Sequence, residues 1–303
     1  MPKAKVQHKG NNSLGFTTLT YWRRIILMFC IFVMMMFLAG FGSMLAARIA
    51  PDSERDRLIW TSVFQNLIGF GGTAIVTALF LSVRPFSLLG LTTVGNWRAL
   101  VGILLVFALG IPFLNQVIYW NEHMHLPSFL ASLETTIRAW EENALSQTSV
   151  LLEGKSVGTL VVNVLVVGVL TGFCEELVFR GTFQRVIGSG GMSPHLAIWI
   201  TAAIFSILHF QFFGFLPRLL LGAFFGYLFY WTGSIWIAGA AHALNNTITV
   251  VLTWLVANGF APVSVDGFGV TAHGFPVMAA ISLVLTLFVL IGMRSYLFST
   301  HKI

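Results

Sequence analysis

The chain has 303 residues, of which 56% are hydrophobic and only 9% are charged, and this composition excludes a soluble globular domain. The formal net charge of +6 comes without a nucleic-acid-binding motif, and the two cysteines, Cys30 and Cys174, both lie in apolar runs, which excludes a disulfide framework. A polytopic membrane protein remains, because runs of about 20 apolar residues recur along the whole chain.

The apolar runs predict an all-α membrane bundle of about eight transmembrane helices. In chain order the predicted spans are Ile25–Ala46, Leu58–Val83, Leu100–Trp120, Val157–Phe179, Leu196–Phe213, Phe215–Trp231, Ile235–Val256 and Val277–Met293. The fifth and sixth spans are so close in sequence that they must form a tight hairpin. Because the first run is longer than the core of a signal peptide and further spans follow, we interpret it as an uncleaved first helix.

The connection between the third and fourth spans predicts an amphipathic helix at the membrane interface, over residues 126–152. Its apolar residues recur on one helical face, whereas Glu134, Arg138, Glu141 and Glu142 fall elsewhere. We interpret the adjacent acids Glu141 and Glu142 as part of a solvated helix face, because their surroundings are polar.

The distribution of Lys and Arg predicts the orientation of the chain. If the N-terminus lies inside, eleven of the 17 basic residues fall in inner segments and six in outer ones. We therefore expect a multi-pass protein of the cell membrane with both termini in the cytoplasm. One bundle without an internal repeat accounts for the chain. Its parts are a basic cytoplasmic tail (1–24), variable N-terminal spans (25–120), the amphipathic connection (121–156), a core (157–256) and a C-terminal loop, last span and tail (257–303).

Two adjacent acids, Glu175 and Glu176, fall at the end of the fourth apolar run. A carboxylate near the bilayer centre costs about 2.5–3.5 kcal/mol on insertion scales, so spans keep one only where partners or a water-filled cavity hold it. Arg180 follows Glu176 by four residues and can pair with it on one helical face. Glu175 is rotated by ~100° from Glu176. One glutamate can therefore be structural while the other faces a reaction centre.

Two histidines, His209 and His242, fall within predicted spans that are separate from the helix of the acid pair. Asn246 follows His242 by four residues and shares its helical face. With a rise of ~1.5 Å per residue, Glu175 and His209 lie roughly 20 Å and 22 Å from the inner connections, and His242 roughly 12 Å. Three helices can thus bring these groups to a common depth.

At these residues the chain resembles the CPBP intramembrane proteases, the family that contains type II CAAX prenyl endopeptidases and Abi bacteriocin-immunity proteins. The resemblance rests on three motifs in order: EExxxR at Glu175–Arg180, FxxxH at Phe205–His209 and HxxxN at His242–Asn246. It covers roughly residues 157–252 and implies hydrolysis of a peptide bond within or beside the membrane.

The resemblance also implies a role for each motif residue. Glu175 would activate a water as general base, with His209 helping to position that water. His242 and Asn246 would donate hydrogen bonds to the tetrahedral oxyanion. Glu176 and Arg180 would orient this group of residues. The implied partners are the lipid bilayer and a peptide or protein substrate, prenylated in CAAX processing; no nucleic acid is expected, and the sequence does not define the oligomeric state.

Participation of a metal stays open at this point. Glu175, His209 and His242 are the three residues that could ligate zinc with one position left for water. The chain lacks an HExxH motif, and we expect no obligatory metal.

Two other functions compete with the peptidase. A transporter would spread polar groups along a route or show inverted repeats with broken spans, and neither pattern is visible. A non-catalytic immunity protein on the same fold would not need the three intact motifs. The peptidase is therefore the favoured interpretation.

Overall fold

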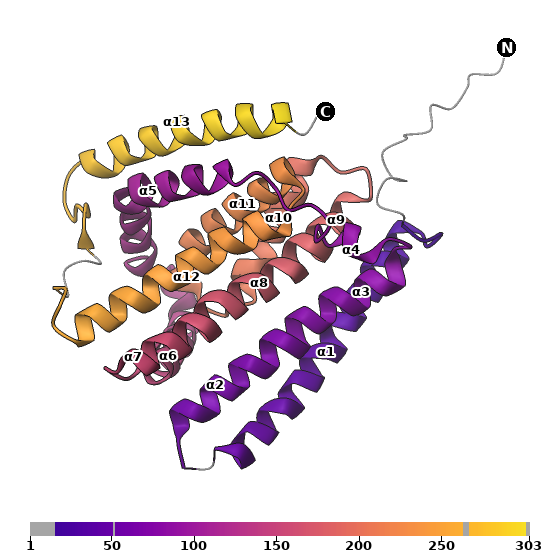
Figure 1. The fold of residues 1–303 in the computed structure, drawn as a ribbon. Helices are drawn as coiled ribbons and strands as arrows, with labels where there is room; N and C mark the ends of the chain where they lie inside the picture. Colours follow the sequence, from indigo (N-terminus) through magenta and orange to yellow (C-terminus); the bar gives the residue numbers. More distant parts are fainter. Residues whose placement is uncertain (1–15, 51, 263–266, 301–303) are drawn as a thin grey trace.

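The computed structural model describes residues 16–50, 52–262 and 267–300, and Figure 1 shows them as a bundle of helices. These residues form no β-strand, and a single isolated bridge joins Phe16 to Ser82. The predicted all-α membrane bundle is therefore confirmed. The first part of the predicted basic tail, with Lys3, Lys5 and Lys9, lies outside the described residues.

Seven helices in the described part of the chain are long and apolar enough to cross a membrane. Five elements that belong to these crossings are unbroken helices: α1 (Tyr21–Ile49), α5 (Arg98–Glu122), α11 (Phe215–Thr232), α12 (Ile235–Ala257) and α13 (Val277–Thr300). The other two crossings, Glu54–Leu81 and Val157–Gly188, each join several helical segments end to end.

These two composite helices contain π-helical stretches. The first consists of α2 (Glu54–Phe64), the π-segment η2 (Gln65–Gly72) and α3 (Thr73–Leu81). The second consists of α7 (Val157–Asn163), the π-segment η4 (Val164–Leu170), α8 (Thr171–Glu176), the π-segment η5 (Leu177–Gln184) and α9 (Arg185–Gly188). π-Segments are rare and often mark functional sites. Here two of them flank α8, the segment that ends with the acid pair.

The predicted fifth span is shorter than expected. Helix α10 covers Pro194–Ile207 and its 14 residues rise about 21 Å, less than the ~30 Å of a hydrocarbon core. The side chain of Ser193 caps its first turn. After Ile207 the chain turns, and Phe210 takes a left-handed backbone conformation with φ 53°. His209 consequently lies in this turn. The prediction that His209 lies inside a membrane-spanning helix is therefore wrong.

Glycine allows the helices around the acid pair to approach closely. A Cβ atom on Gly172 of α8 would lie 2.6 Å from the backbone nitrogen of Ala243 on α12. Only a residue without a side chain fits such a contact. Helices α8 and α12 therefore touch backbone to backbone, which brings the end of α8 beside His242.

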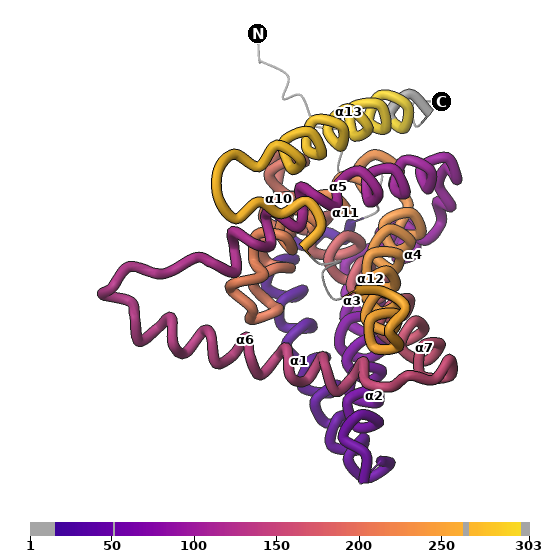
Figure 2. The backbone as a smooth tube through the Cα atoms, turned by 90° about the vertical axis from the view of Figure 1, so that its left-hand side faces the viewer, coloured from indigo at the N-terminus to yellow at the C-terminus, as the bar shows by residue number. Residues whose placement is uncertain are grey.

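The connecting helix is present where the sequence predicted it. A short 3₁₀ turn, η3 (Ser128–Leu130), leads into α6 (Ala131–Leu152). Figure 2 shows α6 running crosswise to α1 and α2, and none of its residues is buried. A surface helix at this position is confirmed; its location in the membrane interface stays a prediction.

Segments predicted to share one side of the membrane meet at one end of the bundle. The Tyr21 hydroxyl donates to the carbonyl of Ile187 at 3.3 Å, and the guanidinium of Arg185 donates to the carbonyl of Ser87 at 2.7 Å. At the same end, Arg98 donates to the Tyr296 hydroxyl at 2.7 Å. These contacts agree with the predicted alternation of the chain across the membrane. Which side is cytoplasmic stays a prediction.

Candidate active site

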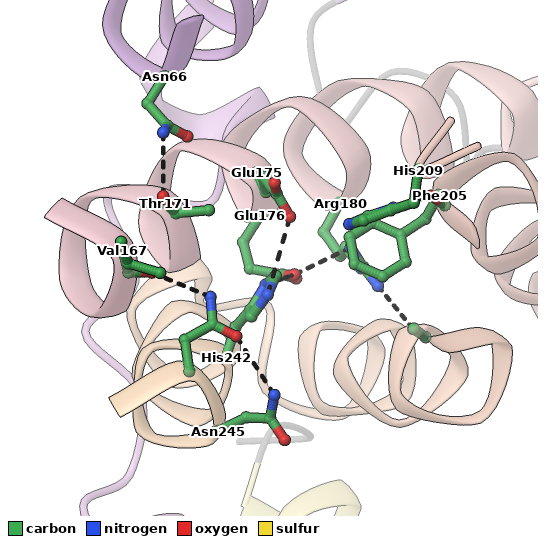
Figure 3. A network of polar contacts seen from close by, with 12 residues as sticks. Asn66, Val167, Thr171, Glu175, Glu176, Arg180, Phe205, His209, His242 and Asn245 are labelled. Atoms are coloured by element: carbon green, nitrogen blue, oxygen red, sulfur yellow. Dashed lines mark hydrogen bonds and ion pairs between the residues drawn. The ribbon is translucent and has the colours of Figure 1, made fainter. Parts of the chain in front are cut away.

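Direct contacts link four of the predicted site residues, Glu175, Glu176, Arg180 and His242 (Figure 3). The two glutamates end α8, Arg180 lies one turn later in η5, and His242 comes from α12. The structure thus joins residues that are separated by 66 positions in the sequence.

The pairing of Glu176 with Arg180 is confirmed. Oε1 of Glu176 lies 2.9 Å from Nη1 of Arg180, and both side chains are fully buried. The guanidinium also donates through Nη2 to the carbonyl of Gly222 on α11, at 2.7 Å. Aromatic rings surround it, with the centroid of Phe205 at 5.0 Å and that of Phe225 at 5.7 Å. Cation–π attraction and the ion pair together stabilise this buried charge.

His242 lies between the two glutamates. Its Nδ1 lies 2.8 Å from Oε1 of Glu176, and its Nε2 lies 3.8 Å from Oε2 of Glu175. The ring stacks on Phe225 with centroids 4.7 Å apart and an interplanar angle of 17°. The hydrogen bond at one ring nitrogen determines which nitrogen is left for chemistry. Because Nδ1 is held by Glu176, Nε2 is the atom that faces Glu175.

Glu175 differs from its neighbour in its contacts. Its carboxylate makes no hydrogen bond to any residue that the structure describes, and the ionisable group closest to it in the ion-pair geometry is the His242 ring, at 3.8 Å. Unlike Glu176, it retains 7% of its surface exposed, and neither of its oxygens is a buried atom without a partner. The two glutamates therefore diverge as the helical geometry predicted, and Glu175 is the one that a water can reach.

His209 adjoins this group without bonding to it. Its Nδ1 lies 2.7 Å from the carbonyl oxygen of Phe205, and its ring packs edge-on against the Phe205 ring at 4.8 Å. It is close enough to Glu175 and His242 to interact with them electrostatically. With Nδ1 engaged, Nε2 is the nitrogen that remains for a water or a substrate.

Asn246 lies one turn beyond His242 on α12 and bonds to other residues. Its Nδ2 donates to the carbonyl of Val167 at 3.2 Å, and its Oδ1 accepts from Asn245 at 3.2 Å. No direct contact to His242 or to the glutamates occurs among the described residues. One N–H of the Asn246 amide is left for another acceptor, because the amide has two.

The three candidate zinc ligands do not come together as a metal site. Among the residues that the structure places, no three His, Cys, Asp or Glu side chains are grouped closely enough to hold a metal ion. Glu175 and His242 face each other, whereas His209 does not join them. The donor set therefore does not fit zinc as arranged here, and no step proposed below passes through a metal.

Residues of α6 and α5 bind the loop that carries His209, and the sequence did not indicate these contacts. The backbone N–H of Phe213 donates to Oε2 of Glu141 on α6 at 2.9 Å, and the guanidinium of Arg138 lies 4.0 Å from the Phe213 ring. Asn121 on α5 donates to the carbonyl of Phe212 at 3.2 Å. The prediction that Glu141 and Glu142 lie on a solvated helix face is therefore wrong for Glu141, whereas Glu142 is exposed. Helical periodicity cannot reveal a backbone donor that arrives from a distant loop.

Sequence reasoning also missed two residues next to the candidate site. Phe225 stacks on His242, and Arg218 interacts electrostatically with Glu175 and His209. Both come from α11, whose uniform apolar pattern carries no signal of the side that faces the site. The single cation in that helix was the available clue for Arg218.

Comparison with known families gives a match to the candidate site region. Residues 157–248, slightly less than a third of the chain, match the family described as "Type II CAAX prenyl endopeptidase Rce1-like". The matched segment contains the acid pair, Arg180, both site histidines and Asn246. Neither the search of curated proteins nor the search of solved structures gave a match.

Proposed function

Residues 157–248 belong to the Rce1-like family of type II CAAX prenyl endopeptidases, and we propose that this multi-pass membrane protein is an intramembrane peptidase in which Glu175 activates the attacking water. The observation that carries the proposal is the approach of His242 to Glu175. Glu176, itself paired with Arg180, binds the opposite nitrogen of the His242 ring and so orients the ring toward Glu175.

Glu175 is suited to be the general base. A carboxylate that is reachable by water and free of hydrogen-bond donors can take a proton from a water as it attacks a peptide carbonyl. The same group then returns the proton to the leaving amine. Proton transfer by a positioned side chain contributes typically about 10²–10⁴ to the rate.

His242 and Asn246 supply the donors proposed for the oxyanion. Because the Nδ1–H of His242 is committed to Glu176, donation from Nε2 requires the imidazolium, and the negative charge of Glu176 offsets its positive charge. Asn246 would add its second N–H. Removing one such donor typically slows catalysis about 10²–10³-fold. His209, through Nε2, positions the water.

A site at this place suits a substrate that is held in the bilayer. The acid pair lies within the apolar crossing Val157–Gly188. A membrane-dissolved group on the substrate, such as a prenyl chain, would present its attached peptide laterally to that crossing. CAAX-type processing of membrane-associated proteins or peptides is therefore the substrate class that we propose.

Cleavage assays on the purified chain in lipid vesicles test this function. A farnesylated CAAX peptide and a quenched-fluorescence peptide library would be compared for the parent, Glu175→Gln, His209→Ala and His242→Ala. Glu142→Gln, which changes an exposed glutamate of the other acid pair, is the matched control and should cleave at the parental rate. Undiminished cleavage by Glu175→Gln would contradict the mechanism.

The same assay tests the alternatives. Loss of cleavage on chelation, with recovery on adding zinc, would overturn the metal-free mechanism. If no peptide is cleaved but a solute or ion gradient depends on Glu175, a transporter is supported in place of a peptidase.

A further inference from the structure

Arg218 is placed to act in the same site. It lies in the first turn of α11, and Gly222, whose carbonyl binds Arg180, follows one turn later on the same helical face. Arg218 therefore faces the side of α11 that lines the site. Its charge interacts with Glu175 and with His209.

The loop after α10 closes over the Arg218 guanidinium. Nη2 donates to Oε1 of Gln211 at 2.5 Å, and Nη1 donates to the carbonyl oxygen of Gln211 at 3.4 Å. A Cβ atom on Gly214 would lie only 2.1 Å from Nη1, so a side chain there would displace the guanidinium from this position. The guanidinium is thus held in one orientation by a loop that also carries His209.

Arg218 has no carboxylate partner among the residues that the structure describes. Glu141 and Glu175 influence it electrostatically, but neither comes within ion-pair distance. Arg180, in contrast, is paired with Glu176 at 2.9 Å. A partly buried cation in a membrane crossing is costly to keep without a counter-ion, which favours a functional reason for its presence.

We infer that Arg218 binds a carboxylate of the peptide substrate while the scissile bond lies at Glu175. A guanidinium presents five N–H donors in a planar fork that matches a carboxylate, and Gln211 accepts only two of them. This inference rests on the proposed function and narrows it to peptides with a carboxylate close to the cleaved bond. The carboxylate is either the free C-terminus or an acidic side chain.

A purely structural role for Arg218 predicts a different result. Through Gln211 it also fixes the loop two residues after His209. Loss of that support would slow cleavage of every substrate by a similar factor. Carboxylate recognition instead changes the ratio between substrates that differ only in that group.

The test therefore uses three matched quenched peptides: one with a free C-terminal acid, one with a C-terminal amide, and an amidated one with an internal Asp. We expect the parent to cleave a carboxylate-bearing peptide about 10–100-fold more efficiently in kcat/KM than the plain amide, as one charge-assisted contact provides. Arg218→Gln should bring this ratio to about one, because KM for the carboxylate-bearing peptide rises to that for the plain amide. Arg218→Lys should give an intermediate ratio, because it keeps the charge and loses the fork.

The matched control is Arg185→Gln. Like Arg218, Arg185 donates to a neutral backbone carbonyl, but it lies at the far end of the bundle, so its variant should keep the parental ratio. Preference for the free acid or for the internal Asp identifies the source of the carboxylate.

Equal cleavage of all three peptides by the parent, or an unchanged ratio in Arg218→Gln, would overturn the inference and leave the proposed peptidase intact. An equal loss on all three peptides would reduce Arg218 to a support of the His209 loop. No cleavage of any peptide by the parent would overturn both proposals together.

Discussion

The chain contains two Glu-Glu pairs, and they have almost opposite surroundings. At the end of α8, Glu176 is fully buried between Arg180 and His242, and Glu175 faces the same histidine. On α6, Glu142 is exposed and Glu141 accepts a single backbone hydrogen bond from a loop. An identical dipeptide thus forms the centre of a buried charge network in one helix and a surface contact in the other.

The difference shows that burial and partners, and not the dipeptide itself, determine which charges an acid pair interacts with. Arg180 and His242 contact the buried Glu176, and three aromatic rings surround the Arg180 guanidinium in place of water. In such surroundings charges interact strongly, and an unpaired charge is correspondingly expensive. On α6, Glu142 is exposed and Glu141 is only partly buried, so water screens the charges of this pair.

The largest effect should come from neutralising the base. Glu175→Gln removes the proton acceptor while keeping the shape, and we expect kcat to fall about 10²–10⁴-fold. Glu141→Gln, which keeps an oxygen acceptor for Phe213, should change kcat by less than about threefold. Turnover of the farnesylated peptide measures both. Comparable losses in the two variants would erase the distinction between the pairs.

The next effect concerns stability. Glu176→Gln leaves the buried guanidinium of Arg180 without its counter-charge, and breaking a buried ion pair in this way costs about 3–5 kcal/mol. The double variant Glu176→Gln/Arg180→Met should recover part of this loss, because no uncompensated charge remains. Thermal unfolding in detergent compares these variants with Glu142→Gln. If Glu176→Gln is as stable as the parent, the Glu176–Arg180 ion pair is not buried as described.

A smaller effect on stability and turnover should follow from removing the hydrogen bond that α6 accepts from the loop at residues 209–214. Glu141→Ala removes the acceptor for the Phe213 N–H, and one such hydrogen bond contributes about 0.5–1.5 kcal/mol. We expect faster hydrogen exchange at residues 209–214 and a modest fall in kcat, since His209 loses support. Glu142→Ala is the control. Equal exchange in both variants would mean that α6 does not hold the loop.

The smallest effect is a pH dependence confined to α6. The backbone N–H of Leu126, followed by the side chain of Arg138, lowers the pKa of Glu134 from 4.5 to about 2. A lowered pKa in the folded state means that this contact stabilises the start of α6 above pH ~4.5 and is lost as the pH falls toward ~2. Relative to the intrinsic exchange rate at each pH, the protection of the amides in residues 126–134 should therefore fall across that window in the parent. In Glu134→Gln the same amides should be weakly protected at every pH; protection in the parent that does not change with pH would contradict the assignment.

Several features of the molecule follow from the sequence because they depend on local periodicity. Long apolar runs define the membrane crossings, since a helix is the structure that satisfies its own backbone in lipid. The amphipathic repeat over residues 126–152 identified α6. Spacing of four residues was enough to pair Glu176 with Arg180 and to turn Glu175 away from them.

Other features were decided only by tertiary contacts. Helix α10 stops at Ile207 and leaves His209 in a turn, and Asn121 and Glu141 from distant helices bind the loop that follows. The apolar run through Phe213 gave no sign of this end.

Tertiary contacts also decided the orientation of His242 and the position of Arg218. Glu176 holds Nδ1 of His242 across 66 residues of sequence, and Arg218 reaches the site because α11 packs beside α10. By itself the sequence determined which segments are helices and that Glu176 pairs with Arg180 along one helix. Only the packed bundle decided which side chains from different helices meet, because those contacts depend on how close glycine lets the helices come and on how each is rotated.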